Sequence, residues 1–150
     1  MKLRDAVPAD APRLDALLTK LIHYEAQYDP NLNGSYVVTG NYLDRIGVEG
    51  HKLLLIEDGG EIAAFLYGFL YDIPDMFAKP IAILDALYVE EAYRRRGYAT
   101  QLISAFRAFA AESGACRIEL KALSRNEAAL RLYERLSFKE TKKYMAMDLT

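Results

Sequence analysis

The sequence predicts a single domain of the mixed α/β class, with strands grouped in the middle of the chain and helices around them. The length of 150 residues fits one domain, and no repeat, low-complexity tract or linker-like segment divides residues 1–150. Apolar strand-like segments occur between residues 52 and 89, and segments of helical periodicity flank them on both sides. A chain of this size buries enough surface to fold without a disulfide or a metal ion.

The first fifty residues predict a strand, a helix and a polar connection. Residues 3–7 form the expected first strand, and Asp10 can cap the helix that follows. Apolar residues recur along this helix at a spacing that places them on one face: Leu14, Leu17, Leu18, Leu21 and Ile22. Residues 24–40 are polar and contain two turn signals, and residues 41–46 predict a second short helix.

The middle of the chain predicts three buried strands. Residues 52–57 and 61–72 are joined by the sequence Asp-Gly-Gly, which is typical of a hairpin. A third strand is expected at residues 81–89, after a turn that contains two prolines. These segments are apolar on both faces, as strands covered on both sides of a sheet must be.

The last third of the chain predicts two helices and three strands. Residues 100–112 carry an apolar helical stripe, and residues 115–123 alternate between apolar and charged side chains. A capping box, Ser-x-x-Glu at residues 124–127, precedes a helix expected at about residues 125–136. Two further strands are expected at residues 138–139 and 143–149.

The composition excludes several classes of function. The net charge of -2 gives no support for a nucleic-acid partner. The longest apolar run, residues 62–71, is half the length of a membrane span, and no secretory signal pattern is visible, so no membrane partner is expected. The single cysteine, Cys116, forms no internal disulfide and fits a reducing compartment. We therefore expect a cytoplasmic protein.

The strongest local signal is a basic turn at residues 94–100, Arg-Arg-Arg-Gly-Tyr-Ala-Thr, between a strand and a helix. A helix N-terminus binds phosphate because its free N–H groups and its dipole both point at the anion. Gly97 permits turn conformations that a side chain forbids, and Ala99 allows a ligand to approach closely. The alternative is a solvated basic turn before an ordinary helix. The glycine spacing fits neither a Walker loop nor a dinucleotide fingerprint.

Two motifs in the second half of the chain resemble those of the GNAT superfamily of N-acetyltransferases. The first motif is Leu87-Tyr88-Val89, followed by Arg94-x-x-Gly97-x-Ala99. The second is Asn126-x-x-Ala129-x-x-x-Tyr133-x-x-x-x-Phe138. The resemblance covers about residues 52–149. The sequence departs from the family pattern at Ser137, which replaces the usual glycine before Phe138.

The resemblance implies a fold and a cofactor. The fold is a central mixed, mostly antiparallel sheet of about six to seven strands with about four helices, splayed between strands 4 and 5. Acetyl-CoA would enter the splayed gap as a co-substrate, with no metal. The implied cofactor contacts are Leu87, Tyr88, Val89, Arg94, Arg95, Arg96, Gly97, Tyr98, Ala99, Thr100, Asn126 and Ala129.

The resemblance also implies two catalytic residues. Tyr133 would protonate the departing CoA thiolate, and its alternative role is that of a core tyrosine on a helix stripe. Asp85 would accept the proton of the amine, because polyamine acetyltransferases of the family carry a glutamate at the matching position. The alternatives are a structural role for Asp85, with water or Glu25 as the base.

Acceptor contacts in this superfamily come from the first helix, the segment after it and the loop between the middle strands. Here those segments supply aromatic and acidic side chains, which suit a cation: Tyr24, Glu25, Tyr28, Tyr71, Asp72 and Asp85. Solvated loop charge is the alternative for each of them.

The sequence thus predicts transfer of acetyl from acetyl-CoA to a primary amine, by direct attack in a ternary complex. A polyamine, an amino sugar or another small amine is the expected acceptor, and a homodimer is possible. The alternatives are a protein N-terminal or lysine acetyltransferase, and a non-catalytic CoA-binding module.

Overall fold

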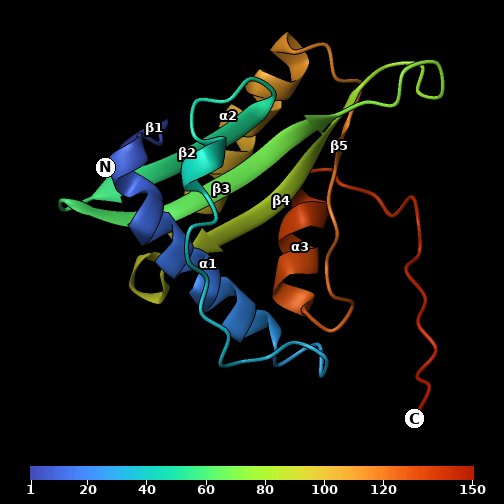
Figure 1. The fold of residues 1–150 in the computed structure, drawn as a ribbon, viewed down its shortest axis with the longest axis horizontal. Helices are drawn as coiled ribbons and strands as arrows, with labels where there is room; N and C mark the ends of the chain where they lie inside the picture. The colour runs from blue at the N-terminus through green and yellow to red at the C-terminus, as the bar shows by residue number, and fades with distance from the viewer.

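A computed structural model describes residues 1–150, which form one mixed sheet of five strands in the order β1-β2-β3-β4-β5 (Figure 1). The strands are β1 (Lys2–Asp5), β2 (His51–Asp58), β3 (Glu61–Tyr71), β4 (Ile81–Val89) and β5 (Ile118–Glu119). All neighbouring strands pair antiparallel except β4 and β5, which pair in parallel. The helices are α1 (Ala11–Glu25), α2 (Tyr98–Glu112) and α3 (Glu127–Arg135), with short 3₁₀ helices at Pro8–Asp10, Leu43–Arg45 and Glu91–Tyr93.

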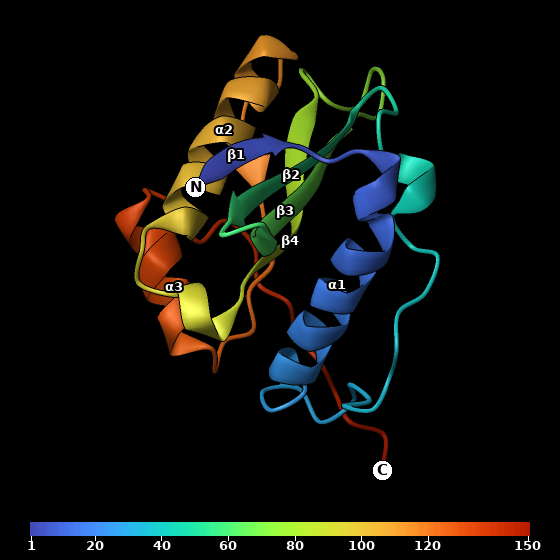
Figure 2. The ribbon, with the colours of Figure 1, turned by 90° about the vertical axis from the view of Figure 1, so that its left-hand side faces the viewer.

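The helices cover both faces of the sheet (Figure 2). On one face, Leu14 and Leu17 of α1 are buried against Phe65 and other residues of β2 and β3. On the other face, Leu102 and Phe106 of α2 are buried in a second cluster. The sheet residues of both clusters come from the same apolar strands, which confirms the expectation that the middle strands are covered on both sides.

A β-bulge on β4 reverses the faces of its side chains halfway along the strand. Tyr67 of β3 pairs with Ala86 and the next residue, Gly68, pairs with Leu84, so Asp85 has no partner of its own. Leu84 packs in the cluster under α2, whereas Ala86 packs in the cluster under α1. Bulges re-aim side chains in this way and are frequent beside active sites. The bulge therefore turns Asp85 out of the regular alternation.

Gly68 allows α2 to approach the sheet at the bulge. A Cβ atom at this position would lie 2.3 Å from the Phe106 ring and 2.7 Å from the carbonyl oxygen of Ile83. We expect Gly68→Ala to lower the free energy of unfolding by about 2–3 kcal/mol, because a rigid ring and a backbone atom must both move. Gly34→Ala is the matched control, since its Cβ would make only an ordinary 3.6 Å contact. Equal unfolding midpoints for the two variants in urea would contradict this account of the packing.

The sheet splays apart between β4 and β5. Only Ala82–Ile118 and Ile83–Glu119 pair, so β4 has no strand neighbour on this side from residue 84 onward. The alternating segment expected at residues 115–123 therefore contributes a strand of two residues, because its remainder diverges from β4. The divergence opens the gap in which the candidate site lies.

Three other expectations need correction. Residues 41–46 contain only the 3₁₀ helix Leu43–Arg45. Residues 138–139 and 143–149 form no strand, because no backbone group of residues 139–150 makes a hydrogen bond with the rest of the chain. The observed totals are thus five strands and three α-helices instead of about six to seven and about four. None of the helices combines the length and the apolar character that a membrane span requires.

Candidate active site

A cavity of about 580 Å³ lies in the gap between β4 and the chain that continues from β5. The N-terminus of α2, the inner side of α3 and the C-terminal end of α1 close it. Most of the residues predicted to hold the cofactor line this one cavity: Leu87, Tyr88, Val89, Arg94, Arg95, Gly97, Tyr98, Ala99, Thr100, Asn126 and Ala129. Residues 120–123 form the opposite wall. The volume is typical of a site for a small organic ligand.

The basic turn presents unpaired backbone donors to the cavity. Gly97 caps α2 with a φ of 78°, and Arg95 has a φ of 65°, so the turn twice enters the left-handed region. The N–H of Gln101 donates to the carbonyl of Gly97 at 3.1 Å, and the three residues before Gln101 have no acceptor within the helix. Turns of this kind and helix N-termini both form concavities that bind anions.

The three arginines of the turn have different surroundings. Arg94 donates from Nε to the carbonyl of Val89 at 3.1 Å, and its guanidinium lies over the Tyr24 and Tyr88 rings. Arg95 lines the cavity, whereas Arg96 does not. Arg96 forms an ion pair of 3.1 Å with Asp58 at the end of β2. Two of the three arginines are therefore placed to meet an anion in the cavity.

Gly97→Val is expected to weaken acetyl-CoA binding at least about 10-fold while the protein stays folded. A β-branched residue is strongly disfavoured at a φ of 78°. No protein atom lies within 4 Å of the added Cβ, so the loss comes from the turn conformation and not from packing. Calorimetry measures the affinity, and circular dichroism checks the fold. A folded variant with unchanged affinity would show that the turn is not the phosphate site.

Helix α3 places Asn126, Ala129 and Tyr133 along the cavity. Asn126 caps the helix, because its Oδ1 accepts from the N–H of Ala129 at 3.3 Å. The helix therefore starts at Glu127, two residues later than the capping box at residues 124–127 predicts. The Asn126 amide N–H groups make no hydrogen bond within the chain and can donate to an amide of the pantetheine arm.

Tyr133 packs against the core cluster under α2, with its ring 5.6 Å from that of Phe138. Its hydroxyl makes no hydrogen bond within the chain, and Tyr133 is one of the residues that line the cavity. Burial, followed by the negative charge of Glu25, raises the pKa of Tyr133 to about 12. The hydroxyl is therefore protonated at neutral pH and can donate a hydrogen bond or a proton.

Two carboxylates line the same cavity, Glu25 at the end of α1 and Asp85 at the bulge of β4. Burial raises the pKa of Glu25, and the charges of Asp85 and Asp29 raise it further. Asp85 is exposed and forms no ion pair within the chain. All three side chains, Glu25, Asp85 and Tyr133, line this one cavity.

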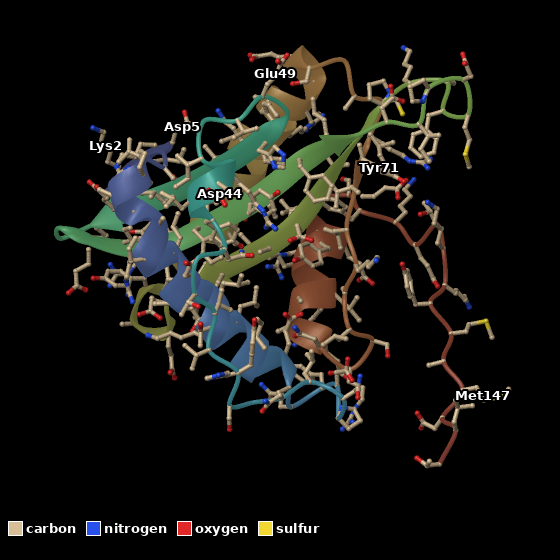
Figure 3. The ribbon with its side chains drawn as sticks, viewed as in Figure 1. Lys2, Asp5, Asp44, Glu49, Tyr71 and Met147 are labelled. Atoms are coloured by element: carbon tan, nitrogen blue, oxygen red, sulfur yellow. The ribbon has the colours of Figure 1, made fainter.

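The structure separates the six predicted acceptor residues into two groups. Tyr24, Glu25 and Asp85 line the cavity, and Tyr28 adjoins it through a 3.4 Å contact between its hydroxyl and that of Tyr24. Tyr71 and Asp72 do not line it. Tyr71 pairs with Ile81 at the opposite end of β4, where its ring contacts Phe77, and Figure 3 shows it beside the outer loop.

The α1 side of Asp85 carries a polar cluster that the sequence did not reveal. The Tyr42 hydroxyl is fully buried and has no hydrogen-bond partner. The Arg45 guanidinium lies 5.9 Å from the Tyr42 ring centroid and 5.2 Å from that of Tyr67, whose hydroxyl contacts Nδ1 of His51 at 2.7 Å. The pKa of the Tyr42 hydroxyl is raised by burial and then by Asp85. No local motif marks these residues, because the cluster joins the 3₁₀ helix at Leu43–Arg45 to two strands.

The fold and the cavity together bring three features to one place: a splayed parallel pair of strands, a basic helix N-terminus and a half-buried tyrosine. The model of the Acetyltransferase (GNAT) family matches residues 18–138. The chain belongs to this family of acetyl-CoA-dependent N-acetyltransferases. No group of three or more His, Cys, Asp or Glu side chains is arranged to hold a metal ion.

Individual relatives agree with this assignment. Over 143 residues the chain is 30% identical to histone acetyltransferase MCC1 of Arabidopsis thaliana, an alignment that covers 88% of this chain and 57% of that protein. The chain thus spans somewhat more than half the length of that relative. A mutant BH1408 protein from Bacillus halodurans has the same fold, with a TM-score of 0.89 and 21% identity over 100% of both chains. The aminoglycoside N-acetyltransferase AAC(6')-Iy, solved with CoA, gives a TM-score of 0.75 and 15% identity over 99% of both chains.

Proposed function

We propose that this protein transfers an acetyl group from acetyl-CoA to the primary amine of a small molecule, such as a polyamine or an amino sugar. One observation carries the proposal. A single cavity is lined by the basic turn at the start of α2, the half-buried Tyr133 and the acidic residues Glu25 and Asp85. These are the groups that direct transfer needs: an anchor for the donor, a proton source for the leaving thiolate and a proton acceptor for the amine.

The position of each residue in the cavity indicates the role that it would have in the reaction. The α2 N-terminus, Arg94 and Arg95 hold the pyrophosphate, and the edge of β4 beyond residue 84 faces the pantetheine arm. Acetyl-CoA supplies the activated acetyl group. A backbone N–H of β4 directed at the acetyl oxygen would stabilise the tetrahedral oxyanion by about 3 kcal/mol. Tyr133 then donates its proton to the sulfur as the carbon–sulfur bond breaks.

The two carboxylates, Glu25 and Asp85, are placed to help remove a proton from the amine, which is the largest electrostatic cost of the reaction. An alkyl ammonium of pKa about 10.4 is neutral in only about one molecule in 2,500 at pH 7, which costs about 4.6 kcal/mol. We assign the proton acceptor to Glu25, because its raised pKa brings it nearer to neutral pH and because it lines the same cavity as Tyr133. The exposed Asp85 attracts the ammonium into the site.

Asp85→Asn separates these two roles through its pH dependence. With the Asp85 charge removed, the pKa of Glu25 falls towards its ordinary value, and the acid limb of kcat/KM moves to lower pH. We expect a loss of about 10-fold or less above that limb, mostly through a higher KM for a cationic acceptor. A loss of about 100-fold or more at every pH would instead make Asp85 the base.

A protein acceptor is the second candidate, and one observation favours it. The β3–β4 loop extends away from the body of the molecule (Figure 1), and none of its residues lines the cavity. A polypeptide could therefore reach the carboxylates from that side. The 30% identity with a histone acetyltransferase points in the same direction.

An acceptor screen that follows release of the CoA thiol tests the proposal and separates the candidates. The panel contains polyamines, amino sugars, peptides with free N-termini and lysine-containing peptides with blocked N-termini. We expect thiol release well above the rate of acetyl-CoA hydrolysis with at least one small amine. Turnover confined to peptides would establish the second candidate. Tight acetyl-CoA binding without turnover of any amine would indicate a non-catalytic CoA-binding module.

A further inference from the structure

Arg45 is a half-buried arginine without an acidic partner. It ends the 3₁₀ helix Leu43–Arg45, which lies beside α1 on one face of the sheet (Figure 2). Its guanidinium lies over the rings of Tyr42 and Tyr67, and it forms no ion pair within the chain. Aromatic rings hold a guanidinium in place without using its N–H groups, so these can still bind an anion from outside the chain.

The segment that carries Arg45 is fixed to α1 by a buried carboxylate. Asp15 of α1 is 6% exposed and accepts hydrogen bonds from the backbone N–H groups of Asn41 at 3.2 Å and Tyr42 at 3.1 Å. The N–H of Arg45 donates to the carbonyl of Tyr42 at 2.9 Å, which closes the 3₁₀ turn. The backbone of Arg45 is therefore in place before a ligand arrives, and such preorganisation lowers the cost of binding.

Asp85 carries the opposite charge on the same face of the sheet. Tyr67 of β3, whose ring lies under Arg45, pairs with Ala86 of β4. Asp85 is the extra residue of the bulge beside this pair, and it lines the cavity together with the C-terminal end of α1. It is exposed and forms no ion pair. Neighbouring strands lie about 5 Å apart, so one small ligand can reach both the carboxylate on β4 and the guanidinium over β3.

We propose that the acceptor is a small amine that also carries a carboxylate, of which an amino acid is the simplest example. Its ammonium group binds at Asp85 and its carboxylate binds at Arg45. Two opposite charges that do not neutralise each other within the chain match a ligand with both charges. A guanidinium can hold a carboxylate through two parallel N–H···O bonds, which fixes the orientation of the ligand. The inference rests on the proposed function and narrows its class of acceptor.

The same arrangement disfavours two other classes of acceptor. The second ammonium of a polyamine would approach the guanidinium of Arg45, and like charges brought together weaken binding. The N-terminus of a protein chain has an amide where a free amino acid has its carboxylate, so it offers Arg45 no charged partner. Arg45 therefore also separates the small-molecule candidate from the protein candidate.

Matched pairs of amines test the inference. Each pair consists of an amino acid and its carboxamide: glycine and glycinamide, β-alanine and β-alaninamide, lysine and lysinamide. We expect kcat/KM for at least one acid to exceed that for its amide at least about 10-fold, and Arg45→Gln to remove this preference. Comparing the acid-to-amide ratio between the two proteins cancels the difference in intrinsic reactivity of the two amines.

Two further variants serve as controls. Arg45→Lys keeps the positive charge but not the fork of N–H groups, so it should keep more of the acid preference than Arg45→Gln does. Arg107→Gln removes an exposed arginine of α2 on the opposite face of the sheet and should leave the acid-to-amide ratio unchanged. All three variants should keep the acetyl-CoA affinity of the wild type, because neither position lines the cofactor cavity.

The outcomes separate this inference from the proposed function. Equal turnover of both members of every pair would overturn the inference and leave the proposed function intact, and so would a preference for acids that Arg45→Gln does not change. No turnover of any amine would count against the proposed function, and calorimetry of the same pairs with the CoA-bound protein then decides the inference. Acids that bind at least about 10-fold more tightly than amides, in the wild type only, would support it. Equal or absent binding would overturn it.

Discussion

Tyr133→Phe is expected to lower turnover by about 100-fold or more while leaving acetyl-CoA affinity nearly unchanged. The substitution removes one oxygen and keeps the ring that packs against Phe138 and the core cluster under α2. A hydroxyl that protonates the leaving sulfur interacts with it mainly in the transition state, so its loss appears in kcat.

The pKa of about 12 for the Tyr133 hydroxyl limits how readily it gives up its proton. Proton transfer from such a group to an ordinary thiolate of pKa about 8.5 is uphill by about 5 kcal/mol. The thiolate is released into the same buried cavity, which raises its pKa as well and reduces the gap. The hydroxyl is therefore expected to act mainly through a strong hydrogen bond that becomes a proton transfer as the sulfur gains charge.

Steady-state kinetics measures turnover and calorimetry measures acetyl-CoA affinity, both on one protein preparation. Tyr71→Phe is the matched control, since Tyr71 lies at the far end of β4 and should keep wild-type rates. Turnover within a few-fold of wild type, together with a lower melting temperature, would make Tyr133 a core residue only. A parallel fall in rate and affinity would mean that the hydroxyl binds the cofactor and is not the acid.

Glu25→Gln is expected to lower kcat/KM for an amine by about 100-fold or more at neutral pH. The amide keeps the shape of the side chain but cannot accept the proton. Because the pKa of Glu25 is raised, the basic form is lost as the pH falls through a value above the usual pKa of about 4.3. The acid limb of the wild-type profile should therefore inflect above that value, and the variant should lack it.

The control for this substitution is Glu134→Gln, which removes an exposed carboxylate on the outer side of α3. Its pH–rate profile should match that of the wild type. A Glu25→Gln profile that also matches, with unchanged kcat/KM, would assign the proton to Asp85 or to water.

Local sequence determined which parts of the site could be predicted. The basic turn, its glycine and the helix after it are contiguous, and their physical consequence at a helix N-terminus follows from residues 94–100 alone. Asn126, Ala129 and Tyr133 lie on one short segment, so their shared exposure to the cavity also follows from spacing. Arg96 shows the limit of this reasoning, because its partner Asp58 lies at the end of β2, far away in the sequence.

Long-range geometry determined the rest. Glu25 at the end of α1 and Tyr133 of α3 line one cavity, and no periodicity of the sequence encodes that arrangement. The bulge at Asp85 depends on the pairing with β3, which the alternation of β4 alone does not reveal. The strand expected at residues 143–149 is absent, and no backbone group of residues 139–150 bonds with the rest of the chain. Side-chain pattern predicts what a segment can form, whereas pairing depends on what the fold places beside it.

Calorimetric titration with acetyl-CoA tests the central claim, that the gap between β4 and β5 is a cofactor site, most directly. We expect one molecule bound per chain, with a Kd between about 1 µM and about 1 mM at low ionic strength. Binding should weaken as salt is added, because a diphosphate meets Arg94 and Arg95. The absence of binding at low salt would contradict the assignment of this cavity to acetyl-CoA.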